Sequence, residues 1–445
     1  MSYKGFLLRL VLVTEVVFAI IVWPEPLDLT ALFLALLLVF SVATLGSVTF
    51  CLTFAFSFCV ATILALVVYG LLAPHGLFET AWQDPLASDS QYFLHQSRYF
   101  LSDYDWSALF TTWGSLVPVF YGAFALMAFG GNYIGIVFFN CLLYTASIFL
   151  AAKLFDISKQ RQRLLPLIGL LPLQGFYNSM LAKEPIYLLL IIGALYAFNH
   201  AVKARCILCW HSLLFILLTF ILVIFRPTGA ILLGLVALIT IAKRFGFMRA
   251  ALLFTVIGIL TIAAVMFANF IHYDLPLFFI GSEGGVNFES NLDIPIERMV
   301  SKQIPGSLME FFLPPWSIVV SPILGLLWMI SPLPLMGELV TALLGLFSDQ
   351  FSFNNFATVI RYLDSFTIAW LFLYLIRSRV SKVVMLQPLM LLGIFQVLTT
   401  VAFQFFESGR HRYLPGFILA VVVILIIGQR ENIKRNRRLS NQIKY

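Results

Sequence analysis

Apolar stretches recur along almost the whole chain, from Leu7 to Gly428, with short polar connections between them. A helix that crosses a bilayer needs roughly 20 mainly apolar residues, and it pairs its own backbone N–H and C=O groups. The composition agrees, since 61% of the residues are hydrophobic and only 11% are charged, whereas a soluble domain is about one quarter charged. The pattern excludes a soluble fold and predicts an all-α, polytopic integral membrane protein whose single transmembrane domain comprises residues 1–445.

The apolar stretches with their charged ends predict twelve transmembrane helices. The expected ranges are 6–23, 29–46, 48–72, 131–152, 164–181, 184–201, 211–226, 227–242, 250–271, 363–376, 383–404 and 413–428. The first is expected to be a retained helix, because Trp23-Pro24-Glu25-Pro26 lacks the small residues of a signal cleavage site. Two further stretches, 107–129 and 314–347, are broken by Gly and Pro. We interpret them as re-entrant or surface-lying segments on the outer side, and counting them as spans would give up to 14.

The basic residues predict the orientation. If both termini are cytoplasmic, 20 of the 28 lysine and arginine residues fall on the inner side, as the positive-inside rule requires. The expected location is a plasma (inner) membrane, with the basic tail 430–445 near anionic lipid. Two outer loops are long, about 73–130 and 272–313, so we expect the chemistry outside. The second loop, with its glycines and acidic residues, could act as a mobile lid or be an ordinary hydrophilic loop.

The first outer loop carries the leading candidate for catalysis. Asp89 lies just beyond an expected helix end and is followed three residues later by Tyr92 and an amphipathic run. A carboxylate partly shielded by aromatic rings can accept a proton from a hydroxyl group. Asp89 is therefore a candidate general base, and Tyr92 a candidate substrate contact, although a hydrated loop would have a similar composition.

Two residues at expected outer helix ends are further candidates. Glu184, in Lys183-Glu184-Pro185, would either complement the dipole of its helix start or serve as a second catalytic carboxylate facing Asp89. Arg226 falls between two apolar spans, where a cation must be paired or solvated. It would bind a lipid phosphate or form an ion pair with a nearby acid.

The strongest candidate for an anion site is Arg410-His411-Arg412 with Tyr413. Several potential cations precede the last helix on a side where basic residues are otherwise scarce, and a helix N-terminus also favours phosphate. Solvated surface residues are the alternative. Of the five cysteines, only Cys206 and Cys209 have metal or redox spacing, and they lack a second ligand pair.

These motifs resemble, in order from about residue 80 to 428, the GT-C glycosyltransferases of the protein-mannosyltransferase and aminoarabinose-transferase type. The matching pieces are Asp89 with Tyr92, Phe129-Gly130-Gly131-Asn132, the basic segment 153–163, Lys183-Glu184-Pro185, Phe225-Arg226-Pro227 and Arg412-Tyr413-Leu414-Pro415. The chain departs from the family by having two helices, 29–46 and 48–72, before the loop where one is usual. It also lacks the large soluble C-terminal domain of some members.

The resemblance implies inverting transfer of a sugar from a polyprenyl-phosphate donor to a glycan, lipid or protein acceptor of the cell envelope. Asp89 would deprotonate the acceptor, and Arg412, Arg410 and Arg226 would stabilise the leaving phosphate. The alternatives are a polysaccharide polymerase or ligase, and a membrane transporter or lipid flippase. The sequence leaves the need for a divalent cation open and gives no reason to expect nucleic acid as a partner.

Overall fold

The computed structural model describes residues 3–23, 29–72, 89–103, 116–159, 161–204, 209–246, 248, 255, 336–346, 353–378, 387–402 and 413–427. Within these ranges 91% of the residues are helical and none is in a strand. The predicted all-α class is therefore confirmed for the described part of the chain.

The helices follow the apolar stretches closely in the first half of the chain. The bounds are α1 Tyr3–Val22, α2 Leu29–Leu45, α3 Val48–Leu72, α4 Asp89–Asp103, α5 Leu116–Ala128, α6 Ile134–Leu154, η4 Arg161–Leu170, α7 Pro172–Asn178, α8 Lys183–Ala204, α9 Trp210–Phe225, α10 Pro227–Phe245, α15 Met336–Leu346, α16 Phe353–Arg377 and α18 Pro388–Ala402. A further helix, Tyr413–Ile427, is the last described element; it is called the C-terminal helix below.

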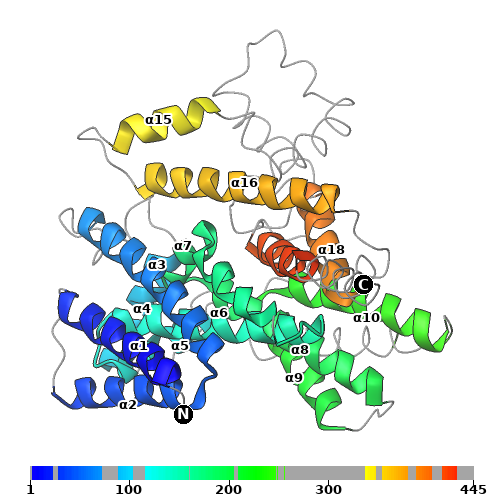
Figure 1. Ribbon diagram of the computed structural model, residues 1–445, viewed down its shortest axis with the longest axis horizontal. Helices are drawn as coiled ribbons and strands as arrows, with labels where there is room; N and C mark the ends of the chain where they lie inside the picture. The colour runs from blue at the N-terminus through cyan, green and yellow to red at the C-terminus, as the bar shows by residue number, and fades with distance from the viewer. Residues whose placement is uncertain are drawn as a thin grey trace, which may run out of the picture.

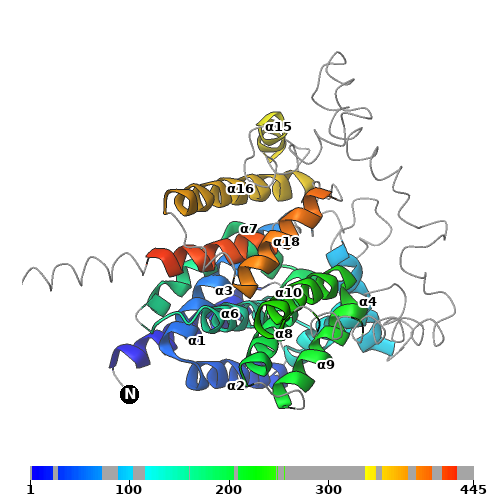
Figure 2. The ribbon, with the colours of Figure 1, turned by 90° about the vertical axis from the view of Figure 1, so that its right-hand side faces the viewer.

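The helices stack in layers. In Figures 1 and 2, α15 and α16 lie along one side of the molecule and α2 along the opposite side. Between them lie α6, α7, α8 and the C-terminal helix, drawn in red. Two hydrophobic clusters hold this arrangement together, and α6 contributes to both, with Phe138 in the first and Tyr144 in the second. The first cluster contains residues from each of the helices α1 through α6. The second connects α6 with the helices that follow it.

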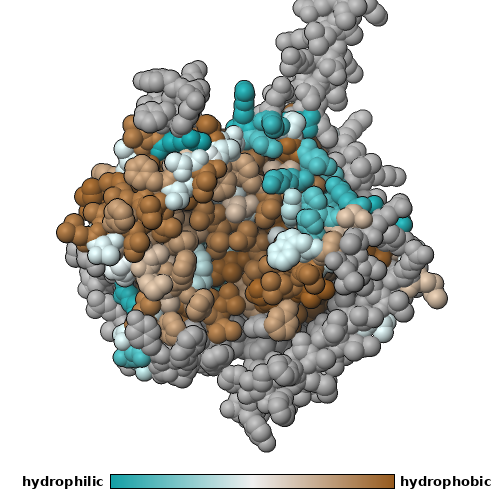
Figure 3. All heavy atoms as spheres, turned by 90° about the horizontal axis from the view of Figure 1, so that it is seen from below, coloured by the Kyte–Doolittle hydropathy of each residue, from teal (hydrophilic) through white to brown (hydrophobic). Residues whose placement is uncertain are grey.

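Four of the described helices are long and apolar enough to cross a membrane. They cover Val48–Tyr69 in α3, Ile134–Leu154 in α6, Lys183–Ala204 in α8 and Phe356–Arg377 in α16. Large apolar side chains are also exposed on α2 and α9, including Leu29, Phe33 and Ile216. The face seen in Figure 3 is covered mainly by hydrophobic residues, with hydrophilic ones gathered along one edge. Such a surface is expected of a helical membrane protein, because lipid rather than water covers it.

The predicted helix 164–181 is wrong, because the segment is broken into η4 and α7. Pro172 opens α7 and keeps Leu171 extended at φ −62° and ψ 126°, since proline disfavours a helical residue before it. Both pieces pack closely against α3. A Cβ atom at Gly169 would lie 3.1 Å from the Ser57 backbone nitrogen, and one at Gly175 would lie 2.5 Å from a methyl carbon of Val60. The irregular backbone is thus buried in protein, as it must be at membrane depth.

The predicted start of helix 363–376 is also wrong, since α16 begins ten residues earlier, at Phe353. Asp364, near the predicted start, therefore lies in the middle of α16, with only 2% of its surface exposed. The sequence prediction began too late because Arg361, a charged residue just before the predicted start, looks like a loop residue in an apolar context. Most of the predicted helix 250–271 lies outside the described residues. Within the two broken stretches, α5 has 13 residues and α15 has 11, each fewer than the roughly 20 of a full span.

Candidate functional site

The connection between α7 and α8 is fixed by side chains from α5 and α6. Asn140 donates from Nδ2 to the backbone oxygens of Asn178, at 3.2 Å, and Met180, at 2.7 Å. Its own Oδ1 accepts from the Tyr121 hydroxyl at 2.8 Å. Tyr133 adds a bond to the backbone oxygen of Ser179 at 3.1 Å. Because these contacts satisfy the irregular backbone before α8, the first turn of α8 is held at a defined place.

Glu184 lies in that first turn and is buried. Its Oε1 lies 3.5 Å from the Arg226 Nη1, and the side chains of Glu184 and Arg226 keep 4% and 20% of their surface exposed. A buried carboxylate requires such a partner because an unpaired charge costs several kcal/mol to bury. Of the two interpretations of Arg226, the structure contains the ion pair.

Arg226 owes its position to a break between two helices. It is the flanking residue of both α9 and α10, with φ −155° and ψ 83°, and Pro227 opens α10. Its guanidinium carbon lies 4.6 Å from the centroid of the Tyr187 ring, a cation–π geometry. Gly229 allows α10 to come this close, because a Cβ atom there would lie 2.5 Å from a ring carbon of Tyr187.

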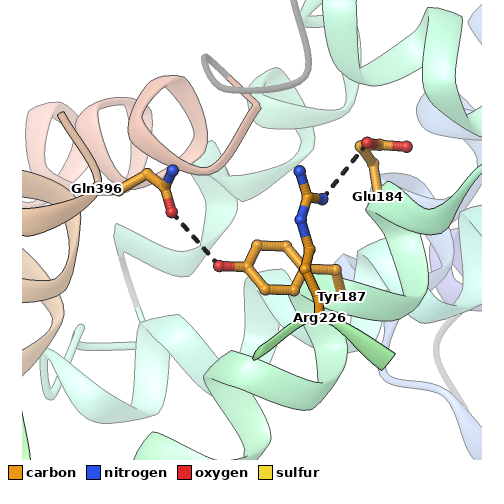
Figure 4. A network of polar contacts seen from close by, with 4 residues as sticks. All are labelled: Glu184, Tyr187, Arg226 and Gln396. Atoms are coloured by element: carbon orange, nitrogen blue, oxygen red, sulfur yellow. Dashed lines mark hydrogen bonds and ion pairs between the residues drawn. The ribbon is translucent and has the colours of Figure 1, made fainter. Parts of the chain in front are cut away.

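Tyr187 extends the contact to a fourth helix. Its hydroxyl donates to Oε1 of Gln396 on α18 at 3.4 Å. Figure 4 shows the resulting chain, which runs from Glu184 through Arg226 and the Tyr187 ring to Gln396. One polar network therefore joins α8, the α9–α10 break and α18. We call these four residues the carboxylate–arginine network.

The first outer candidate, Asp89, is the first residue of α4. The ammonium group of Lys183 lies 5.1 Å from the centroid of the Phe93 ring, so the side chain of the first residue of α8 reaches the second turn of α4. Asp89 precedes Phe93 by four residues, which is about one helical turn. Tyr92 is partly buried and its ring packs against Phe93. The structure thus brings the start of α4 next to the helix end that carries Glu184.

Of the four candidates before and at the last helix, the structure describes only one. Arg410, His411 and Arg412 lie outside the described residues. Tyr413 begins the C-terminal helix and is buried against the rings of Tyr144 and Tyr177. Its backbone oxygen accepts from Gln174 Nε2 at 3.1 Å, and its hydroxyl has no hydrogen-bond partner among the described residues. The C-terminal helix packs against α18, which carries Gln396, since a Cβ atom at Gly393 would lie 3.2 Å from a carbon of the Ile418 side chain.

The sequence interpretation missed Tyr187, Gln396 and Gln174. A signal was present for the first two, since Tyr187 lies three residues after Glu184 on one helix face and Gln396 is an isolated amide in an apolar stretch. No group of three or more histidine, cysteine or acidic side chains that could hold a metal ion occurs among the residues that the structure describes.

Comparison with known proteins gives no relative. The chain matches no protein-family model, no curated protein and no solved structure.

Proposed function

We propose that the chain is a membrane glycosyltransferase that moves a sugar from a polyprenyl-phosphate donor to a cell-envelope acceptor. The observation that supports this most is the meeting of three candidate segments at one end of the bundle. The start of α4 with Asp89, the start of α8 with Glu184 and the α9–α10 break with Arg226 come together there. The sequence predicts this end to be the outer one.

In the proposed reaction, Asp89 accepts the proton of the acceptor hydroxyl while the acceptor oxygen attacks C1 of the sugar. The bond between C1 and the phosphate oxygen breaks, and the phosphate leaves with the electron pair. Charge grows on that phosphate in the transition state, so preorganised arginine donors there lower the barrier most. Arg412 and Arg410 supply them, together with Arg226. Among the described residues, the Arg226 side chain makes one hydrogen bond, to Glu184, which leaves N–H donors for a phosphate.

Glu184 has a positioning role in this proposal. A carboxylate bound to Arg226 holds the guanidinium over Tyr187 and keeps the buried site neutral before the donor arrives. Tyr92 packs against Phe93 and so lies at the same end of the bundle, where in this proposal it contacts the acceptor.

The test is a transfer assay with purified full-length protein and a panel of polyprenyl-phosphate sugars, with release of polyprenyl phosphate as the readout. Asp89→Asn keeps the shape of the side chain and removes its basicity, so the rate should fall by about 10²–10⁴-fold. Asp103→Asn, at the exposed far end of the same helix, is the matched control and should keep the rate within about twofold. Normal turnover by Asp89→Asn contradicts the assigned base, and no release from any donor by the wild type contradicts the proposed class.

A transporter or lipid flippase is the second candidate, and two observations favour it. The η4–α7 segment is a discontinuous helix, and Asp364 is a buried acid inside α16. Broken helices and embedded acids are common at transport sites. If the reconstituted protein moves a polyprenyl-phosphate sugar across the membrane of vesicles without cleaving the sugar–phosphate bond, this candidate is favoured over the transferase.

A further inference from the structure

The opposite end of α8 carries a second cluster that the proposed function does not use. Tyr196 and His200 lie one turn apart on α8, with ring centroids 4.4 Å from each other. His200 stacks on His211 of α9 at 5.1 Å, with 18° between the ring planes. The ammonium group of Lys153, at the end of α6, lies 5.9 Å from the centroid of the Tyr196 ring. We call Lys153, Tyr196, His200 and His211 the histidine cluster.

The charges around this cluster are mainly positive. The positive charges of Lys153 and Lys203 interact electrostatically with His200. Asp156 is the one acid among the described residues that does the same. Lys153, Lys203 and Asp156 are exposed, and both histidines are partly exposed. Two stacked imidazoles repel each other when both are protonated, so an anion beside them would stabilise the doubly charged state.

The start of α9 adds to the attraction for an anion. The first turn of α9, which follows Cys209, contains no acidic residue. The first N–H groups of a helix point outward and favour negative charge. His211 lies in this first turn, directly beside the stacked ring of His200.

The surface next to the cluster has the character of a membrane interface. Trp210 is 71% exposed, and tryptophan is enriched at the level of the lipid headgroups. Farther along α9, Leu213, Ile216 and Leu217 are each more than half exposed. These apolar side chains would face the acyl chains of the membrane. The histidine cluster would then lie at the depth of the lipid headgroups.

We propose that the histidine cluster binds the phosphate of an anionic phospholipid in the leaflet at the basic end of the bundle. Lys153 and Lys203 attract the phosphate, His200 and His211 donate to its oxygens, and the positive end of the α9 dipole adds to the attraction. The lipid's acyl chains lie along the exposed apolar side of α9. A bound lipid would join α6, α8 and α9 at the end opposite the carboxylate–arginine network.

The test is lipid titration of the purified full-length protein, with native mass spectrometry to count bound phosphatidylglycerol or phosphatidylcholine. The wild type should retain phosphatidylglycerol more tightly. Lys153→Gln should raise the apparent Kd about fivefold, because one basic residue near an anionic surface contributes about 1 kcal/mol. The double variant His200→Gln/His211→Gln should raise it as well. Lys243→Gln, which removes a cation of α10 from outside the cluster, is the matched control and should change the Kd by less than about twofold.

If Lys243→Gln weakens lipid binding as much as Lys153→Gln does, the binding reflects diffuse surface charge and the proposal is overturned. Unchanged affinity in Lys153→Gln and in the double variant would overturn it too, as would displacement of the lipid by millimolar inorganic phosphate.

Discussion

The two ends of α8 each hold a cation over an aromatic ring, but in opposite surroundings. At the start of the helix, Arg226 lies over Tyr187 and is paired with the buried Glu184. At the end, Lys153 lies over Tyr196 beside two histidines, and no salt bridge of Lys153 occurs among the described residues. The buried Glu184–Arg226 pair thus carries no net charge, whereas the exposed end keeps an excess of positive charge.

The difference follows from burial. A charge removed from water needs a partner of opposite sign, whereas an exposed cation is solvated and stays available to an external anion. The first end is therefore suited to hold a fixed geometry for chemistry. The second is suited to bind a mobile charged partner such as lipid.

The largest expected contrast between the two ends is their side of the membrane. In a background with the five cysteines replaced, Asp89→Cys should react with a membrane-impermeant thiol reagent in intact cells, and Gln160→Cys should react only after permeabilisation. The basis is the distribution of lysine and arginine, which predicts that the segment 153–163 is cytoplasmic. Protection at 89 together with labelling at 160 would reverse the topology and remove the support for chemistry at the outer face.

The next effect is on stability at the buried end. Glu184→Ala should lower the free energy of unfolding by about 3 kcal/mol, because it leaves Arg226 without its partner. The estimate is at the low end for a broken buried pair, since Arg226 keeps 20% of its side-chain surface exposed. Thermal unfolding of the purified protein measures it. The double variant Glu184→Ala/Arg226→Met should recover part of the loss, and a strictly additive double variant would mean that the pair is not coupled.

A smaller effect separates the two aromatic rings. Tyr187→Leu should cost about 2 kcal/mol, because it removes a buried cation–π contact and the bond to Gln396. Tyr196→Leu, the matched change at the exposed end, should cost about 0.5–1 kcal/mol. Thermal unfolding of the two variants under one condition gives the ratio. Equal costs would show that burial does not distinguish the ends.

Much of the fold could be predicted from hydrophobicity, because burial in lipid leaves a continuous apolar signal. The ranges of α2, α3, α6 and α8 agree with the sequence prediction to within a few residues. The signal failed where polar residues are buried by protein. The η4–α7 break needs the neighbouring Asn140 and Tyr133 to satisfy its backbone, and the part of α16 that precedes the predicted start contains Arg361.

The candidate site could be predicted only in part, since a sequence shows charges but not their partners. The sequence marks Glu184 and Arg226 as charges at expected helix ends, and it allows two interpretations of each. Their mutual contact depends on Gly229, which lets α10 pack closely against Tyr187. Gly229 and Tyr187 are 42 positions apart in the sequence. No local pattern encodes such an approach.

The most direct test of the central claim, that the carboxylate–arginine end is the donor site, is crosslinking with a photoreactive polyprenyl phosphate. After illumination of the full-length protein, mass spectrometry maps the labelled peptides. The account predicts label around the starts of α4, α8 and α10, with loss of label in Arg226→Ala. Label concentrated instead at the histidine cluster, or unchanged by Arg226→Ala, would contradict it.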